Sequence, residues 1–231
     1  MGRFKMILWS KPKDFSIEDM VDIAYKILQQ LKNYGDEINP KYITARSKSL
    51  AKEFNLDKDS IKSLLEKQVD KISLKAFNRL TSRISFFSSM DDDKCSGIRI
   101  GLGNHDPLFS NTCVVHLLEN FSGLAERRNE FVDLFKQLIE SFEPYYAFVS
   151  NDSDDNSGKG FWQNNKPTNA HWMNYFDTIT ADSIGLNAVL SIVGGERLKN
   201  GYFFMLQDEP LDVNNSEQMQ KQGEVRELLG L

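Results

Sequence analysis

Two amphipathic helical patterns enclose a run of short strand-like segments, and this alternation constrains the fold more than any other feature of the sequence. Over residues 16–35, apolar side chains recur at helical spacing. Ser16 is placed as an N-cap with Asp19 three residues later, and Gly35 is placed as a stop. A second stripe recurs over residues 123–144. The stripes consist of Ile17, Met20, Val21, Ala24, Leu28 and Leu31, and of Phe131, Leu134, Phe135, Leu138, Ile139 and Phe142.

Short β-branched or aromatic runs between turn-like segments indicate the strands. They span residues 3–10, 82–90, 96–103, 111–120, 145–150, 171–177, 188–195 and 201–207. Further helical patterns cover residues 57–71, 180–186 and 215–230. Strands that cluster at such close spacing favour antiparallel pairing. We therefore predict an α+β fold, with a mostly antiparallel sheet packed with amphipathic helices, in a single domain over residues 1–231.

Membrane and secreted classes are disfavoured. No apolar run reaches the roughly 18–20 residues that span a bilayer, and the N-terminal stretch lacks the features of a signal peptide. Cys95 and Cys113 could pair, but two cysteines in 231 residues do not suggest a disulfide framework. We expect a cytoplasmic protein with reduced thiols and no membrane partner.

The charge is unevenly distributed along the chain. The formal net charge is −5, with +5 on residues 1–80 and −10 on residues 81–231. An acidic region of this size argues against nucleic acid as its direct partner. It is compatible with a basic protein partner, and equally with an acidic surface that serves solubility.

No motif for catalysis or cofactor binding stands out. The three histidines, His105, His116 and His171, lack the spacing of zinc ligands, and His116 reads as a structural residue within a strand. The segment 101–106, "GLGNHD", begins like a dinucleotide-binding loop but lacks the third glycine, which favours a strand-to-turn junction. We expect no catalytic residue, cofactor or metal. A hydrolase or transferase with an unrecognised carboxylate or histidine site stays open as the alternative.

Two acidic clusters lie in turn-like segments and are our candidates for partner binding. They comprise Asp91, Asp92 and Asp93, and Asp152, Asp154 and Asp155. Adjacent carboxylates could instead hold Ca²⁺, but the loop from residue 152 lacks the acidic twelfth position of the EF-hand pattern. A calcium-dependent module is therefore a third hypothesis.

The segment 169–179, "NAHWMNYFDTI", carries residue types that occur in active sites. As a strand it would place His171 and Asp177 roughly 20 Å apart, too far for a dyad. Strand alternation would put both on one face, with Met173 and Tyr175 between them. Trp172, Asn174 and Phe176 would then share the other face, with the two aromatic side chains in the core.

The order of features from "PYYAFVS" onward resembles the immunity proteins of bacterial polymorphic toxin systems, specifically immunity-protein family 52. The resemblance rests on the "HWMNYFD" block, together with a first strand bearing Trp9 and a long amphipathic helix after it. It implies a cytosolic α+β protein without enzymatic activity. Such a protein binds a cognate toxin, often a nuclease delivered by a secretion system such as type VI. It carries over no contact residues, toxin identity, mode of inhibition or oligomeric state.

Overall fold

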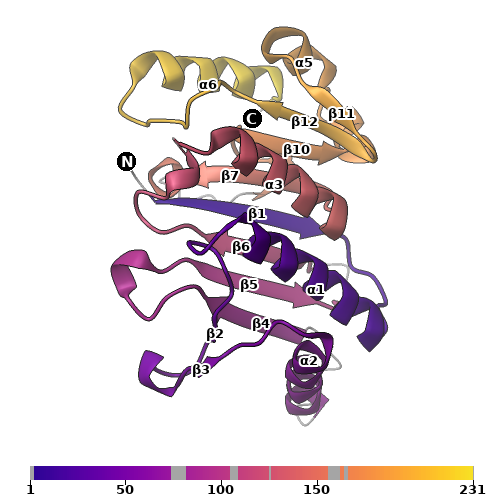
Figure 1. Ribbon diagram of the computed structural model, residues 1–231. Helices are drawn as coiled ribbons and strands as arrows, with labels where there is room; N and C mark the ends of the chain where they lie inside the picture. Colours follow the sequence, from indigo (N-terminus) through magenta and orange to yellow (C-terminus); the bar gives the residue numbers. More distant parts are fainter. Residues whose placement is uncertain are drawn as a thin grey trace.

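The computed structural model describes residues 3–73, 82–104, 109–124, 126–155, 162–163 and 166–230. Their strands form a ten-stranded sheet in the order β11-β12-β10-β7-β1-β6-β5-β4-β2-β3, and every pairing in it is antiparallel (Figure 1). The predicted α+β class is therefore confirmed. The strands are β1 (Phe4–Ser10), β2 (Tyr42–Ile43), β3 (Lys52–Glu53), β4 (Ser82–Phe87), β5 (Gly97–Leu102), β6 (Asn111–His116), β7 (Tyr146–Asn151), β10 (Met173–Asp177), β11 (Glu196–Leu198) and β12 (Gly201–Met205). Strands β8 (Trp162–Gln163) and β9 (Lys166–Pro167) form a separate two-stranded antiparallel sheet.

Three helices cover one face of this sheet, in front of it in Figure 1. They are α1 (Ile17–Tyr34), α2 (Lys58–Ser73) and α3 (Arg128–Phe142). The predicted capping box at α1 is present, since Ser16 Oγ accepts from the Asp19 backbone N–H at 3.1 Å and the Asp19 carboxylate accepts in return. Gly35 follows the helix end with a positive φ of 151°. Both predicted apolar stripes pack into the main core, in which Ile17 is partly buried.

Three further helices cover only part of the opposite face. They are α4 (Thr178–Ser183), α5 (Asn187–Val193) and α6 (Ser216–Leu228). Their buried side chains, such as Ala181, Val189 and Val225, form a second core with Phe148 of β7 and Phe204 of β12. Strands β7, β10 and β12 are therefore covered on both faces.

One predicted strand is a helix. Residues 188–195 were expected to be extended, but α5 occupies most of that segment. Leu186, Val189, Leu190 and Val193 recur at helical spacing, and all four belong to or pack against the second core. A short apolar run is compatible with the two-residue period of a strand and with the period of a helix. Here contact with the second core selects the helix.

The predicted faces of segment 171–177 are partly wrong. Asn174 accepts from the backbone N–H of His171 at 2.9 Å and donates to its carbonyl at 2.6 Å. Because of this local turn, the strand begins at Met173, and the side chains before it do not continue the alternation between the two faces of the sheet. As a result Trp172 lies in the main core and Phe176 in the second core, both fully buried.

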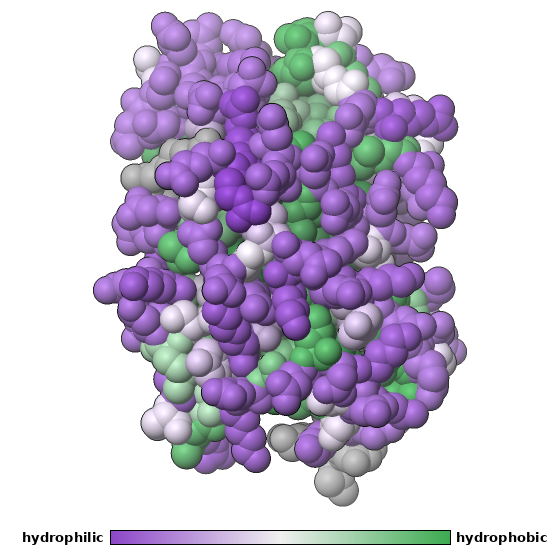
Figure 2. Space-filling model, viewed as in Figure 1, coloured by the Kyte–Doolittle hydropathy of each residue, from purple (hydrophilic) through white to green (hydrophobic). Residues whose placement is uncertain are grey.

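The front of the molecule is mostly hydrophilic, with small separate hydrophobic areas (Figure 2). Both cysteines are free, Cys113 being buried and Cys95 partly exposed. No helix within the described part of the chain has the length and apolar character needed to cross a membrane.

Candidate partner-binding surface

The two predicted acidic clusters lie at the same end of the strands, along the border of the sheet that the strand ends form. Because neighbouring strands are antiparallel, β1 starts where β4 and β7 end. The turn after β4 carries Asp91–Asp93, and Asp152 directly follows β7, where its backbone N–H donates to Arg3 O at 2.8 Å. With strand spacing of about 4.8 Å, the two clusters are roughly 15–19 Å apart. The fold thus assembles a single acidic border from segments distant in sequence.

We call this border the acidic edge: the connections at residues 35–41, 88–96, 117–127 and 206–215, together with Asp152. With Arg3, which directly precedes β1 at the same end, its described side chains are eleven acids and four bases. These are Asp36, Glu37, Asp91, Asp92, Asp93, Glu119, Glu126, Asp152, Asp208, Glu209 and Asp212, against Arg3, Lys41, Lys94 and Arg127. The connections described at the opposite edge, within 11–16, 103–110, 143–145 and 199–200, hold Lys11, Lys13 and Lys199 against Asp14 and Glu143. The negative charge is therefore concentrated at one end of the strands.

Several of the acids form ion pairs at the surface. Lys41 Nζ lies 3.1 Å from Asp36, Lys48 Nζ 2.6 Å from Asp92, and Arg128 Nη1 3.1 Å from Glu209. The hydrogen bond from Lys41 lowers the pKa of Asp36 below its ordinary value. Such exposed pairs contribute little stability, and each offsets one negative charge of the edge.

Other acids of the edge are unpaired. Within the described part of the chain, Asp93, Glu119, Asp208 and Asp212 take part in no ion pair, and all four are exposed. Their carboxylates are available to a cation brought by another molecule.

The turn of Asp91–Asp93 has a defined local structure. Asp91 Oδ1 accepts from the Asp93 backbone N–H at 3.1 Å, which caps the 3₁₀ turn Asp92–Lys94. Lys48 also donates to Ser89 O and Met90 O, so it ties this turn to the chain before β3. The three carboxylates are therefore held in an ordered turn.

The second predicted cluster is described only in part. Asp152 pairs with Lys5 at 3.3 Å, across the β1–β7 border. Asp154 and Asp155 continue the 3₁₀ turn Asp152–Asp155, but their side chains lie outside the described ones. Their predicted role in partner binding stays a prediction.

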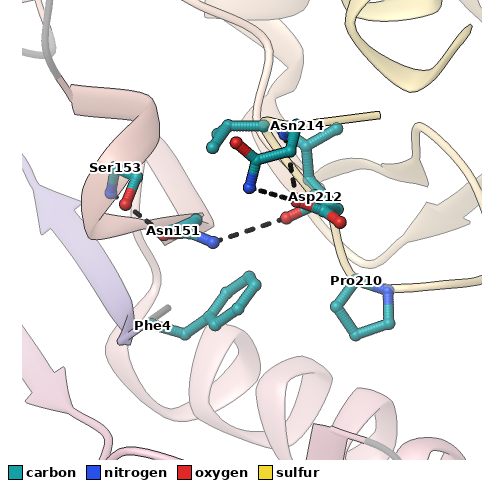
Figure 3. Close-up of a pocket in the computed structure, with 8 residues that line it drawn as sticks. Phe4, Asn151, Ser153, Pro210, Asp212 and Asn214 are labelled. Carbon is teal, nitrogen blue, oxygen red and sulfur yellow. Dashed lines mark hydrogen bonds between the residues drawn. The ribbon is translucent and has the colours of Figure 1, made fainter. Parts of the chain in front are cut away.

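A hollow of about 460 Å³ opens at this edge between the turn after β7 and residues 210–214 (Figure 3). Phe4 contributes an apolar surface, held edge-on against Trp172 at 6.0 Å. Asn151 Nδ2 donates to Leu211 O at 3.5 Å, and its Oδ1 accepts from the Ser153 N–H at 2.9 Å. Apolar and polar groups thus line the hollow together.

Asp212 brings a carboxylate to the same hollow. Its Oδ1 accepts from the backbone N–H and the side-chain amide of Asn214, at 3.0 and 3.1 Å (Figure 3). Its own N–H donates to Gln218 Oε1 at 2.7 Å, which fixes the loop against α6. An apolar wall beside a carboxylate suits an inserted Lys or Arg, whose stem is apolar and whose end is cationic.

Two of the three histidines lie within the described residues. His171 is buried and stacks on Phe148 with ring centroids 4.3 Å apart. His116 was expected to be a structural residue within its strand, but it is the exposed last residue of β6. His105 lies outside the described residues. Among the side chains that are described, no group of three or more His, Cys, Asp or Glu is arranged to hold a metal ion.

No protein-family model and no curated protein matches the chain. Among solved structures, the Pseudomonas aeruginosa T6SS protein PA0821 is similar, with a TM-score of 0.64 and 10% sequence identity. The match covers 99% of this chain and 73% of that chain. At this identity the likeness concerns the fold, so membership of immunity-protein family 52 stays a prediction.

The acids of residues 206–215 were missed from the sequence. The stretch "QDEPLDVNN" follows an apolar strand, contains Asn and Pro, and shares with the two clusters that were singled out a high content of Asp. That signal marks an acidic turn. Only the strand order places this turn beside Asp152.

Proposed function

We propose that this protein is an immunity protein that binds a cognate toxin delivered by type VI secretion, and neutralises it by protein–protein contact at the acidic edge. The concentration of charge at one end of the sheet carries the proposal. A fold needs no such segregation for stability, because like charges held close together repel. A complementary basic partner offsets this cost and gains a faster encounter.

The nature of the partner follows from the charge and the hollow. The neighbouring structure is named as a type VI secretion protein, which agrees with a toxin–immunity setting. A toxin that acts on nucleic acid has a basic surface, and the acidic edge complements such a surface. The hollow beside Asp212 then receives one Lys or Arg of the toxin as a central anchor.

The competing hypothesis of a hydrolase or transferase gains no support from the described residues. The imidazole of His171 is packed against Phe148 within the second core. The exposed acids line a surface border that spans several strands, and they do not converge on a single point. Binding is the function that this arrangement favours.

The test is co-expression with each toxin domain that the neighbouring genes encode. We define an edge variant, Asp93→Asn, Glu119→Gln, Asp208→Asn and Asp212→Asn. We define a control variant with the same charge change, Glu140→Gln, Glu143→Gln, Asp182→Asn and Glu227→Gln, at exposed positions away from the acidic edge. Wild type and control should restore growth and co-purify with the toxin, and the edge variant should do so poorly. Failure of the wild type to protect or to co-purify would reject the function itself.

A further inference from the structure

Strands β4, β5 and β6 present one face that no described helix covers. Their inward side chains, such as Ile84, Ile98 and Val115, belong to the main core under α1–α3. The outward side chains alternate with them and form what we call the open face. It consists of Arg83, Ser85, Phe87, Gly97, Arg99, Gly101, Thr112, Val114 and His116.

Two arginines lie side by side on the open face. Arg83 lies opposite Gly101 and Arg99 opposite Ser85, so the two are diagonal neighbours on adjacent strands, roughly 7–8 Å apart at their backbones. Both are exposed, and neither forms an ion pair or hydrogen bond within the described part of the chain. Two adjacent guanidinium groups in the middle of a sheet repel one another when no anion is present.

Glycine leaves space on one side of Arg99. Gly97 and Gly101 are its neighbours on the same face of β5, and Gly97 is partly exposed whereas Gly101 is buried. A Cβ built at Gly97 would meet only the Cβ of His116, at 3.9 Å, so this position has room for a side chain that the sequence does not supply. A ligand can therefore reach the guanidinium of Arg99 along the sheet surface, over Gly97, as well as perpendicular to the sheet.

A hollow of about 290 Å³ adjoins Arg99 at the β4–β5 end of this face. Its lining includes Lys48, Arg99 and His116, with the Phe87 ring, and none of its lining residues is acidic. Lys48 Nζ lies 5.4 Å from the centre of that ring. Desolvation lowers the pKa of His116, and Lys5 and Arg99 act in the same direction against the opposing effect of Asp152. Lys48 is already paired with Asp92 and bonded to Ser89 O and Met90 O, so Arg99 is the cation that this lining presents to an anion.

From these observations we propose that the open face binds carboxylate side chains of a partner protein, with Arg83 and Arg99 as their guanidinium ligands. A guanidinium binds a carboxylate through two parallel hydrogen bonds, which gives orientation as well as attraction. The inference rests on the proposed function, because the partner is the same toxin. Its basic surface meets the acidic edge, and an adjacent acidic segment meets the open face.

A nucleic acid is the less suitable anion. The acidic turn Asp91–Asp93 closes the hairpin of the very strands that carry the arginines, so a long phosphate chain would meet repulsion there. Single-stranded nucleic acid also needs exposed aromatic rings for stacking, and Phe87 is only 7% exposed. Opposite charges on adjacent surfaces instead suit a folded partner, whose orientation they fix.

The test compares dissociation of the purified toxin domain from wild type, R83Q/R99Q, R99K and the matched control K26Q/K32Q, whose two lysines are exposed on α1. All four should unfold at similar temperatures. We expect R83Q/R99Q to dissociate about tenfold faster or more, because charge-assisted bidentate bonds are lost. R99K should show a smaller increase in the dissociation rate, because lysine keeps the positive charge but cannot form the two parallel hydrogen bonds of a guanidinium. The control should stay within about twofold of wild type.

Three outcomes would overturn the inference. If R83Q/R99Q dissociates like the control while the edge variant binds poorly, the open face is outside the interface and the proposed function stands. If the wild type does not bind the toxin domain, both fail together. If a fluorescein-labelled single-stranded DNA binds the wild type and R83Q/R99Q loses that binding, the ligand is a phosphate chain, and the assignment to carboxylates is wrong.

Discussion

The back of the sheet changes character between its two halves. Across β7, β10 and β12 it carries aromatic side chains, such as Tyr146, Phe148 and Phe176, and α4–α6 pack over them. Across β4–β6 it carries Arg99, Thr112 and other mostly polar or small residues, with Phe87 and Val114 as exceptions, and no described helix lies over them. An antiparallel sheet needs only one covered face. Packing therefore dictates the side chains of the first half, whereas those of the second are free to serve a partner.

The largest expected effect comes from removing a ring in the covered half. Phe148 is fully buried between Tyr146, at a ring distance of 4.9 Å, and His171 at 4.3 Å. Phe148→Ala should lower the free energy of unfolding by about 3–5 kcal/mol, because it leaves a cavity. Thr112→Ala in the open half should change it by about 0.5 kcal/mol or less. Urea unfolding of both variants measures the difference, and equal losses would mean that the two halves are packed alike.

A pair of glycines gives a second contrast. A Cβ at Gly201 in β12 would lie 2.1 Å from Phe176 O, a backbone atom of the paired strand. Gly201→Ala should therefore cost about 3 kcal/mol, at the upper end of overpacking. Gly97→Ala meets no such contact and should be neutral, or stabilising by about 0.4–1 kcal/mol, because it restricts the unfolded chain. Thermal unfolding distinguishes the two, and a tolerated alanine at residue 201 would contradict the tight β10–β12 pairing.

The reactivity of the two cysteines tests how accessible the helix-covered face and the open face of the sheet are. No change in stability is expected. Burial raises the pKa of Cys113 to about 12 on the helix-covered side. Cys95 lines the hollow on the open side. At pH 8 only about one Cys113 thiol in ten thousand is ionised, so a thiol reagent should modify Cys95 alone until denaturant is added. Modification of both at equal rates in the native protein would show that the β6 core opens readily.

The sequence was sufficient for the parts of the fold that rest on local signals. Helix α1 was predicted to within a residue or so, because its apolar stripe, the Ser16 cap and Gly35 all agree. Helix α5 was not predicted, because residues 188–195 are compatible with a strand or a helix until their contact with the second core is known. The bend before Met173 was missed for a similar reason. It depends on one side chain, Asn174, that bonds to the backbone of His171.

The candidate site was predicted as separate pieces. Asp91–Asp93 and Asp152 were recognised from composition and turn signals, and the structure places them at one edge. Asp208 and Asp212 were missed, because their position depends on the order β12-β10-β7-β1, which joins strands far apart in the chain. The open face was missed for the same reason, since Arg83 and Arg99 are neighbours only through the β4–β5 register.

The most direct test of the account is the rate at which the toxin domain associates with the edge variant and with the control variant, measured over a range of ionic strengths. We expect the edge variant to associate about tenfold more slowly than wild type at low salt, with a weaker salt dependence. The control should keep the rate and slope of the wild type. Equal rates and slopes for the edge variant and the control would show that charge acts without regard to position, and would contradict the acidic edge as the binding surface.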